Sequence, residues 1–120
     1  MINFALVGCG RIGKRHVDLL GNNQIKNAHL TAVCDVKKER AEDFGKKYNV
    51  PYYFDMDEML TKEKSIDAVS ILTPSGLHAQ HALNLVKYKK HILVEKPMAL
   101  TLDDADAMIS ACAENGVKLF

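Results

Sequence analysis

The chain has 120 residues, of which 48% are hydrophobic and 26% charged, and its formal net charge is +1. This length suits one domain, and the near-neutral charge argues against a dedicated nucleic-acid-binding protein, which needs a basic face to neutralise phosphates. No apolar run reaches the roughly 20 residues that a membrane helix requires, so we expect neither a nucleic acid nor a membrane as partner.

Short apolar runs without alternation recur along the chain, and each is typical of a strand buried on both faces of a sheet. In chain order they are Phe4–Val7, Leu30–Cys34, Tyr52–Phe54, Ala68–Leu72 and His91–Val94. Between them, apolar side chains return with the period of a helix that packs one face on a core. The four helical stripes are Ile12–His16–Leu19–Leu20, Ala41–Phe44–Tyr48, Ala79–Ala82–Leu83–Val86 and Leu102–Ala105–Ile109–Cys112.

Strict alternation of strand and helix predicts right-handed crossovers and an α/β fold. We expect a doubly wound parallel sheet of five or six strands, with helices on both faces. Thr101–Asp104 has the pattern of a capping box, and Gly116 suits a left-handed helix end. Val117–Phe120 then begins a further strand, which suggests a single domain cut off before a second one.

The N-terminus and the cysteines indicate the compartment. Met1–Phe4 lacks the basic segment and cleavage site of a signal peptide. Cys9, Cys34 and Cys112 are odd in number and form no C-x-x-C pair, as expected of buried thiols in a reducing compartment. We therefore expect a cytoplasmic protein.

The first strand leads into Gly8–Gly13, a G-x-G-x-x-G sequence that precedes a helix. In a dinucleotide site, Gly8 makes the tight turn, Gly10 lets the backbone approach a pyrophosphate, and Gly13 lets helix and strand pack closely. The helix N-terminus adds partial positive charge for the phosphates. The alternative is a merely structural turn from strand to helix.

The second strand is followed by Asp35, which lies 22 residues after Gly13. This spacing is near that of the acid that holds the adenosine ribose, and a carboxylate there favours NAD because it repels the 2′-phosphate of NADP. Lys37 and Lys38 leave NADP open. Asp35 could instead only cap the helix predicted from Lys37 to Tyr48.

The loop after the fourth strand, Thr73–His78, is placed to pass over the middle of a bound dinucleotide. Pro74 ends the strand and Ser75 can cap the following helix. His78 and His81 are spaced as neighbours on one helix face, but no carboxylate or cysteine completes a zinc-like set, so we expect no metal. His81 is interpreted as an ordinary surface or core residue.

The fifth strand is followed by Glu95, Lys96 and Pro97. Beside a nicotinamide, the Lys96 ammonium could hold a substrate hydroxyl and stabilise negative charge on its oxygen as hydride leaves carbon. The alternative is a surface Glu–Lys ion pair, worth about 0–1 kcal/mol.

Together, GCGRIG, Asp35, TPSGLH and EKP resemble the nucleotide-binding half of the glucose–fructose oxidoreductase / inositol dehydrogenase (Gfo/Idh/MocA) family, over essentially all 120 residues. The start and end also resemble its UDP-linked amino-sugar uronate 3-dehydrogenase branch. The resemblance implies a Rossmann domain over residues 1–120 that binds NAD or NADP, followed in the whole enzyme by a substrate domain absent from this chain. It assigns the cofactor contacts to Gly8, Gly10, Arg11, Ile12, Gly13, Asp35, Thr73, Pro74, Ser75, His78, Glu95 and Lys96.

The resemblance further implies that Lys96 is catalytic, that Pro97 follows a cis peptide, and that a second catalytic group lies in the missing domain. The whole enzyme would move hydride between nicotinamide and a hydroxyl of a sugar, sugar nucleotide or polyol, as a homo-oligomer, whereas this fragment alone would be nearly inactive. Two alternatives remain. One is a non-catalytic NAD-binding sensor module, and the other is a methyltransferase with an adenosine cofactor, against which the EKP sequence argues.

Overall fold

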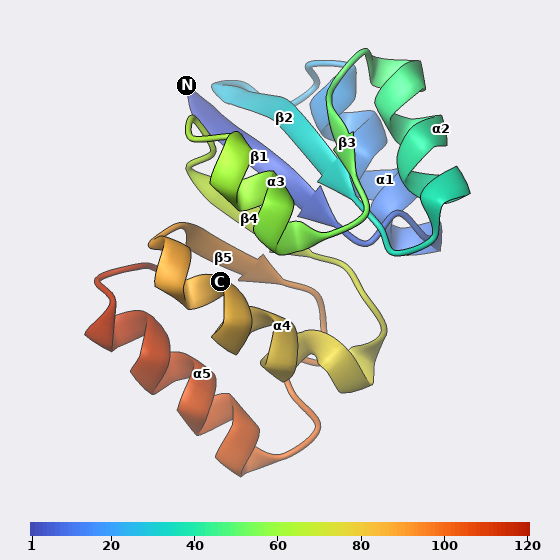
Figure 1. Ribbon diagram of the computed structural model, residues 1–120. Coiled ribbons are helices and arrows are strands. Elements are labelled where there is room, and N and C mark those ends of the chain that lie inside the picture. Colours follow the sequence, from blue (N-terminus) through green and yellow to red (C-terminus); the bar gives the residue numbers. More distant parts are fainter.

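The computed structural model describes residues 1–120 and has one parallel sheet of five strands in the order β3-β2-β1-β4-β5 (Figure 1). All four neighbouring pairs of strands are parallel. The chain winds outward from β1 to β3 and then returns to the other side of β1, so the order reverses between β1 and β4. The strands are β1 (Ile2–Val7), β2 (Ala28–Cys34), β3 (Tyr52–Tyr53), β4 (Ala68–Ile71) and β5 (His91–Val94). The predicted fold class is confirmed.

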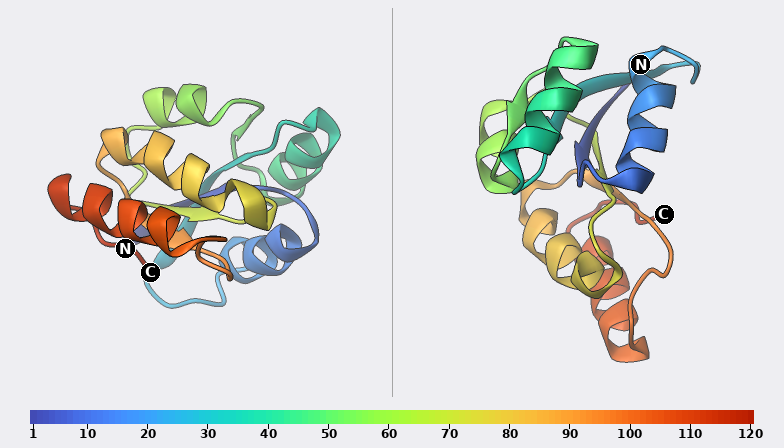
Figure 2. Two further views of the ribbon diagram at one scale, coloured as in Figure 1. Left: turned by 90° about the horizontal axis from the view of Figure 1, so that it is seen from below. Right: turned by 90° about the vertical axis from the view of Figure 1, so that its right-hand side faces the viewer.

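Helices cover both faces of this sheet, with α3 and α4 on the opposite side from α1 (Figure 2). They are α1 (Arg11–Gly21), α2 (Lys38–Tyr48), α3 (Met56–Lys62), α4 (His78–Leu85) and α5 (Leu102–Glu114), with 3-10 turns η1 (Ser75–Leu77) and η2 (Val86–Tyr88). No helix has both the length and the apolar character needed to cross a membrane.

The core is divided between the two faces because successive strand residues point in opposite directions. Ala5 and Val7 of β1 belong to a cluster of 16 buried residues that includes side chains of α3, α4 and α5. Leu6 belongs to the other cluster, of 8 buried residues, which includes Val17 of α1. The apolar side chains of one strand are thus buried on both faces of the sheet.

Three of the predicted helical stripes are partly wrong about the face that is buried. In α4, Leu83 is 38% exposed, whereas Leu85, outside the predicted stripe, is buried. In α1 the buried apolar residues are Val17 and Leu20, whereas Leu19 is 40% exposed. In α5 the buried residues are Met108 and Cys112, whereas Ile109 is 54% exposed. Apolar side chains stand on more than one face of each helix, so spacing alone did not identify the packed face.

The end of the chain confirms three local predictions. Thr101 Oγ1 accepts a hydrogen bond from Asp104 N at 3.1 Å and so caps α5. Gly116 has a φ of +67°. Leu119 then forms a parallel bridge with Ile92, so the C-terminal segment Val117–Phe120 begins to pair with the edge of β5.

Candidate cofactor-binding site

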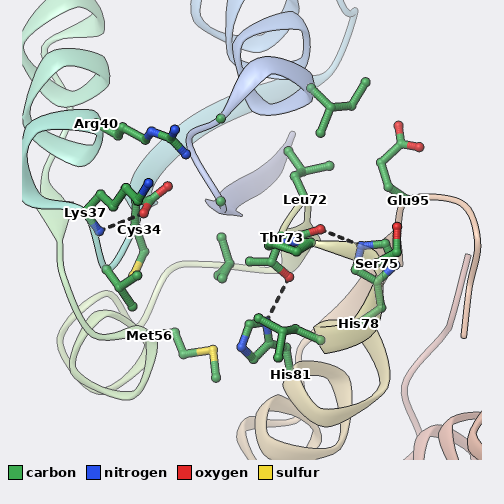
Figure 3. A pocket seen from close by; sticks show the side chains of 18 of the residues that line it. Cys34, Lys37, Arg40, Met56, Leu72, Thr73, Ser75, His78, His81 and Glu95 are labelled. Carbon is green, nitrogen blue, oxygen red and sulfur yellow. Dashed lines mark hydrogen bonds between the residues drawn. The ribbon is translucent and has the colours of Figure 1, made fainter. Parts of the chain in front are cut away.

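A cavity of about 800 Å³ extends along the carboxyl edge of the sheet, a volume within the usual range for small-molecule sites. Its wall includes both Asp35, which follows β2, and Lys96, which follows β5. Figure 3 shows Arg40 and Lys37 at one side of this cavity, with Ser75, His78 and Glu95 at the other. The predicted residues that line it are Gly8, Gly10, Arg11, Ile12, Asp35, Thr73, Pro74, Ser75, His78, Glu95 and Lys96.

The three glycines after β1 differ in what a side chain would meet. A Cβ on Gly8, whose φ is +106°, would lie 2.7 Å from the backbone of Leu72. A Cβ on Gly13 would collide with the Gly8 carbonyl oxygen, so Gly13 lets α1 pack closely against the turn at Gly8. Gly13 does not line the cavity. A Cβ on Gly10 would have only Arg40 Nη1, at 3.5 Å, within contact range. Packing therefore explains Gly8 and Gly13, while Gly10 keeps the backbone open toward the cavity.

Asp35 is held by two backbone amides. Its Oδ2 accepts from Cys9 N and its Oδ1 from Lys37 N, each at 2.8 Å. The second bond forms a turn before α2, whose N-cap is Lys37 and has no side-chain cap. Asp35 thus does not occupy the N-cap position of the helix, and its carboxylate is fixed in the wall of the cavity with lone pairs left to accept further bonds.

Arg40 is a cavity residue that the sequence analysis missed. It comes from the first turn of α2 and its guanidinium lies beside Gly10. Its position five residues after Asp35 was the available signal. Lys38 lies instead 5.3 Å over the Phe54 ring and does not line the cavity, whereas Lys37 does.

The loop after β4 is tied down by histidines. His78 is buried, and its Nε2 bonds the Thr73 carbonyl oxygen at 2.7 Å while its Nδ1 bonds the Pro97 carbonyl oxygen at 2.8 Å. Both ring nitrogens are therefore engaged by protein atoms. The expected cap by Ser75 is wrong, because Ser75 begins the turn η1 and the N-cap of α4 is Leu77.

His81 also faces the cavity, which corrects its interpretation as an ordinary residue. Its Nδ1 lies 2.9 Å from Thr73 Oγ1. Burial, and to a smaller extent the nearby His78, lowers the pKa of His81 below its usual value. The ring is thus biased toward its neutral form beside the loop.

The Glu95 carboxylate pairs with the His16 side chain of α1 and not with the Lys96 ammonium. Its Oε1 lies 3.0 Å from His16 Nε2 of α1, and its Oε2 accepts from Lys96 N at 3.0 Å. The hydrogen bond from His16, followed by that from the Lys96 amide, lowers the pKa of Glu95. The alternative of a Glu95–Lys96 surface ion pair is wrong, and the Lys96–Pro97 peptide is cis as expected.

Comparison with known proteins identifies the family of the chain. Residues 2–120 match the family model described as "Oxidoreductase family, NAD-binding Rossmann fold". The chain is 38% identical over 120 residues to scyllo-inositol 2-dehydrogenase (NADP(+)) IolU of Bacillus subtilis, covering 99% of this chain and 36% of that protein. It is 31% identical over 119 residues to myo-inositol 2-dehydrogenase of Thermotoga maritima, covering 99% of this chain and 35% of that protein.

Among solved structures, the WlbA dehydrogenase from Bordetella pertussis in complex with NADH and UDP-GlcNAcA aligns with a TM-score of 0.91 and 35% identity, covering 99% of this chain and 36% of that one. Scyllo-inositol dehydrogenase from Lactobacillus casei, with bound NAD(H) and scyllo-inositol, gives a TM-score of 0.89 and 30% identity, covering 100% of this chain and 35% of that one. The chain thus spans about a third of the length of these relatives. It belongs to the Gfo/Idh/MocA oxidoreductase family and has that family's NAD-binding Rossmann fold.

Proposed function

We propose that the cavity on the carboxyl edge binds NAD(H) in an extended form, with the pyrophosphate at Gly10, the adenosine ribose at Asp35 and the nicotinamide near Lys96. The observation that carries this proposal is that Gly10 has no packing reason to lack a side chain, yet stands in the wall of the cavity. Between Asp35 and Lys96, the cavity wall includes further polar and charged side chains, among them Arg11, Arg40 and Ser75.

The pyrophosphate fits the start of α1. Gly10 is the N-cap of this helix and supplies no side-chain bond, so the first-turn amides are free to donate to an anion. Arg11 and Ile12 belong to that turn and line the same wall. Arg40 brings a positive charge to the same place, which complements the negative phosphates.

The ribose fits Asp35, whose carboxylate is already oriented by two amides and can accept from the 2′- and 3′-hydroxyls. This favours NAD. Lys37 and Arg40 lie close enough in the wall to receive a 2′-phosphate, so NADP is the second cofactor that the site can hold.

The nicotinamide end fits the loops after β4 and β5. Thr73, Pro74 and Ser75 of the loop after β4 line the cavity together with Glu95 and Lys96 of the segment after β5. Bound there, NAD supplies a hydride acceptor. The Lys96 ammonium would donate a hydrogen bond to the substrate hydroxyl and stabilise negative charge on its oxygen as hydride leaves. In the whole protein the substrate would be a sugar, sugar nucleotide or polyol, and a second domain would contribute most of its contacts.

NADH titration of Gly10→Ala tests the cofactor pose. The added methyl group meets only the flexible end of Arg40, so we expect the free energy of unfolding to fall by less than about 1 kcal/mol. It would stand where the pyrophosphate must approach, so the NADH dissociation constant measured by fluorescence should rise by about tenfold or more.

Gly76→Ala is the matched control, because a Cβ there lies 3.7 Å from Leu100 and Gly76 does not line the cavity. It should bind NADH as the original chain does. Equal NADH affinity in Gly10→Ala and Gly76→Ala would place the pyrophosphate elsewhere and overturn the pose.

Turnover is tested in the complete gene product with Lys96→Ala. Loss of the group that holds the substrate hydroxyl should lower kcat by about 10²–10⁴-fold while the NADH dissociation constant changes by less than about threefold. The sensor alternative predicts that both the original protein and Lys96→Ala bind NADH and that neither of them turns over any alcohol tested.

A further inference from the structure

The short segment that carries Lys96 is fixed from two sides by two histidines that reach it from different helices. Lys96 itself is exposed, between β5 and the start of α5. Its neighbours Glu95 and Pro97 each bond to a histidine, His16 on α1 and His78 on α4. The position of the lysine therefore depends on contacts that its own side chain does not make.

The contact from α1 acts through a carboxylate. Glu95 Oε1 lies 3.0 Å from His16 Nε2, and the other oxygen accepts from Lys96 N at 3.0 Å. The two side chains are about a quarter exposed, 24% for His16 and 25% for Glu95. Because one carboxylate bonds both groups, holding its first oxygen also holds the backbone of Lys96.

The contact from α4 acts through two backbone carbonyls. His78 is 1% exposed and joins the Pro97 carbonyl oxygen, directly after Lys96, to the Thr73 carbonyl oxygen in the loop after β4. Carbonyl oxygens only accept, so a ring that carries both N–H groups donates to both carbonyls at once, whereas a neutral ring, with one N–H, donates to one of them. His78 thereby connects the Lys96 segment to the loop that is proposed to border the nicotinamide.

We propose that His16 and His78 are positioning residues for Lys96. His16 links the segment to the helix whose N-terminus is proposed to receive the pyrophosphate, and His78 links it to the loop after β4. The lysine is thereby held at a fixed place relative to both parts of the cofactor site. This inference rests on the proposed function in assigning Lys96 to the nicotinamide end, whereas the two anchors themselves can be tested with or without NADH.

The first test uses His16→Leu and His16→Gln, with amide hydrogen exchange followed by NMR in the free and the NADH-saturated chain. His16→Leu removes the partner of Glu95, so exchange at the Lys96 amide should accelerate by about tenfold. His16→Gln can still donate to Glu95, so exchange should return to within about threefold of the original rate. His29→Leu, at an exposed position near the start of β2, is the control and should leave the exchange of the Lys96 amide unchanged.

Global unfolding measured in urea separates positioning from general loss of stability. The proposal requires Lys96 exchange to change while amides in the centre of β1 keep exchange rates that follow the global free energy of unfolding. It also requires the NADH dissociation constant of His16→Leu to stay within about threefold, because the phosphate and ribose contacts are untouched. Unchanged Lys96 exchange in His16→Leu would overturn the role of His16.

The second test uses His78→Leu, which cannot donate a hydrogen bond, and the amide resonance of Met98, which belongs to the same peptide group as the Pro97 carbonyl. Loss of the bond from His78 should shift this resonance and accelerate Lys96 exchange by about threefold or more. An unshifted Met98 resonance in His78→Leu would overturn the role of His78, and if that variant does not fold, His78→Met, which also lacks a donor, is measured in its place. If the original chain fails to bind NADH, the proposed function fails while the exchange data still test the anchors.

Discussion

Two buried thiols, Cys9 and Cys34, lie close to Asp35, and Cys34 is part of the cavity wall. Cys9 donates its backbone amide to Asp35, and its Sγ lies 3.5 Å from the Cys34 carbonyl oxygen. Burial, reinforced by nearby carboxylates, raises the pKa of both thiols from 9.0 to about 12. Only the thiolate is a good nucleophile, so these cysteines are chemically inert in the folded chain.

Alkylation by iodoacetamide at about pH 8 checks this prediction. Cys9 and Cys34 should remain unmodified in the folded chain and react fully in urea, where their pKa returns to about 9. Peptide mass spectrometry measures the modified fraction of each. Rapid alkylation of Cys9 without unfolding would contradict the burial described here.

The same pKa shifts predict an alkaline loss of stability. Below pH 9 both thiols are protonated in the folded and unfolded states. Between pH 9 and about 12 only the unfolded state releases its protons, so the free energy of unfolding falls as pH rises. Urea unfolding across this range should show the decline, and a double variant with Cys9→Ala and Cys34→Ala should flatten it.

Tyr53 adds to this effect. Burial and Glu63 raise the pKa of Tyr53 to about 12, so its titration also lowers the free energy of unfolding as the pH rises above about 10.

For individual residues of the candidate site, the sequence allowed a prediction where the chemistry permits few residue types. Gly8 and Asp35 were predicted because turns and ribose sites require those types at that spacing. It was uninformative about bonds between distant residues, such as His16 with Glu95 or His78 with Pro97, which are 79 and 19 residues apart. Those bonds depend on how α1 and α4 are placed on the sheet.

The helices show what periodicity can and cannot predict. Helix α5 was expected from its apolar stripe and its cap, and both the helix and the bond from Asp104 N to Thr101 are present. The predicted buried face is displaced by one residue, because Met108 is buried in place of its neighbour Ile109. Which of the two packs against the core depends on how the helix lies on the sheet. Helix α3 was not predicted, since its seven residues are too few for a periodic signal.

The cap of α5 can be tested by substitution. Thr101→Ala removes the acceptor for Asp104 N and should lower the free energy of unfolding by about 1 kcal/mol. NADH affinity should not change, because Thr101 does not line the cavity. The control Ser110→Ala, at an exposed position inside the same helix, should be neutral or slightly stabilising because alanine is the better helix former.

For the whole molecule, the parallel topology determined most of the candidate site. A doubly wound sheet delivers every strand-to-helix loop to one edge, so residues far apart in the sequence meet there without any further assumption. This is why the predicted loops converge on one cavity. Phe54 and His81 were missed as wall residues because they reach the cavity from a strand end and from a helix, and no short sequence motif marks either position.

The C-terminal segment Val117–Phe120 pairs with β5, the strand at one edge of the sheet. It exchanges three backbone hydrogen bonds with β5, from Ile92 N to Lys118 O, from Phe120 N to Ile92 O and from Val94 N to Phe120 O, each at 2.9 Å. Val117 is 9% exposed and belongs to the larger core cluster. Beyond this segment's contacts, β5 is a sheet edge, and an open edge favours association with other chains.

Deletion of Val117–Phe120 should therefore lower the free energy of unfolding by about 2 kcal/mol or more, from the lost burial of Val117 alone, and should promote aggregation. Urea unfolding and light scattering measure the two effects. The matched variant Phe120→Ala keeps all three backbone bonds and removes a side chain that is 69% exposed, so it should cost less than about 0.5 kcal/mol. If deletion and Phe120→Ala are equally mild, the segment does not act as a sixth strand, and the edge of β5 is stable without it.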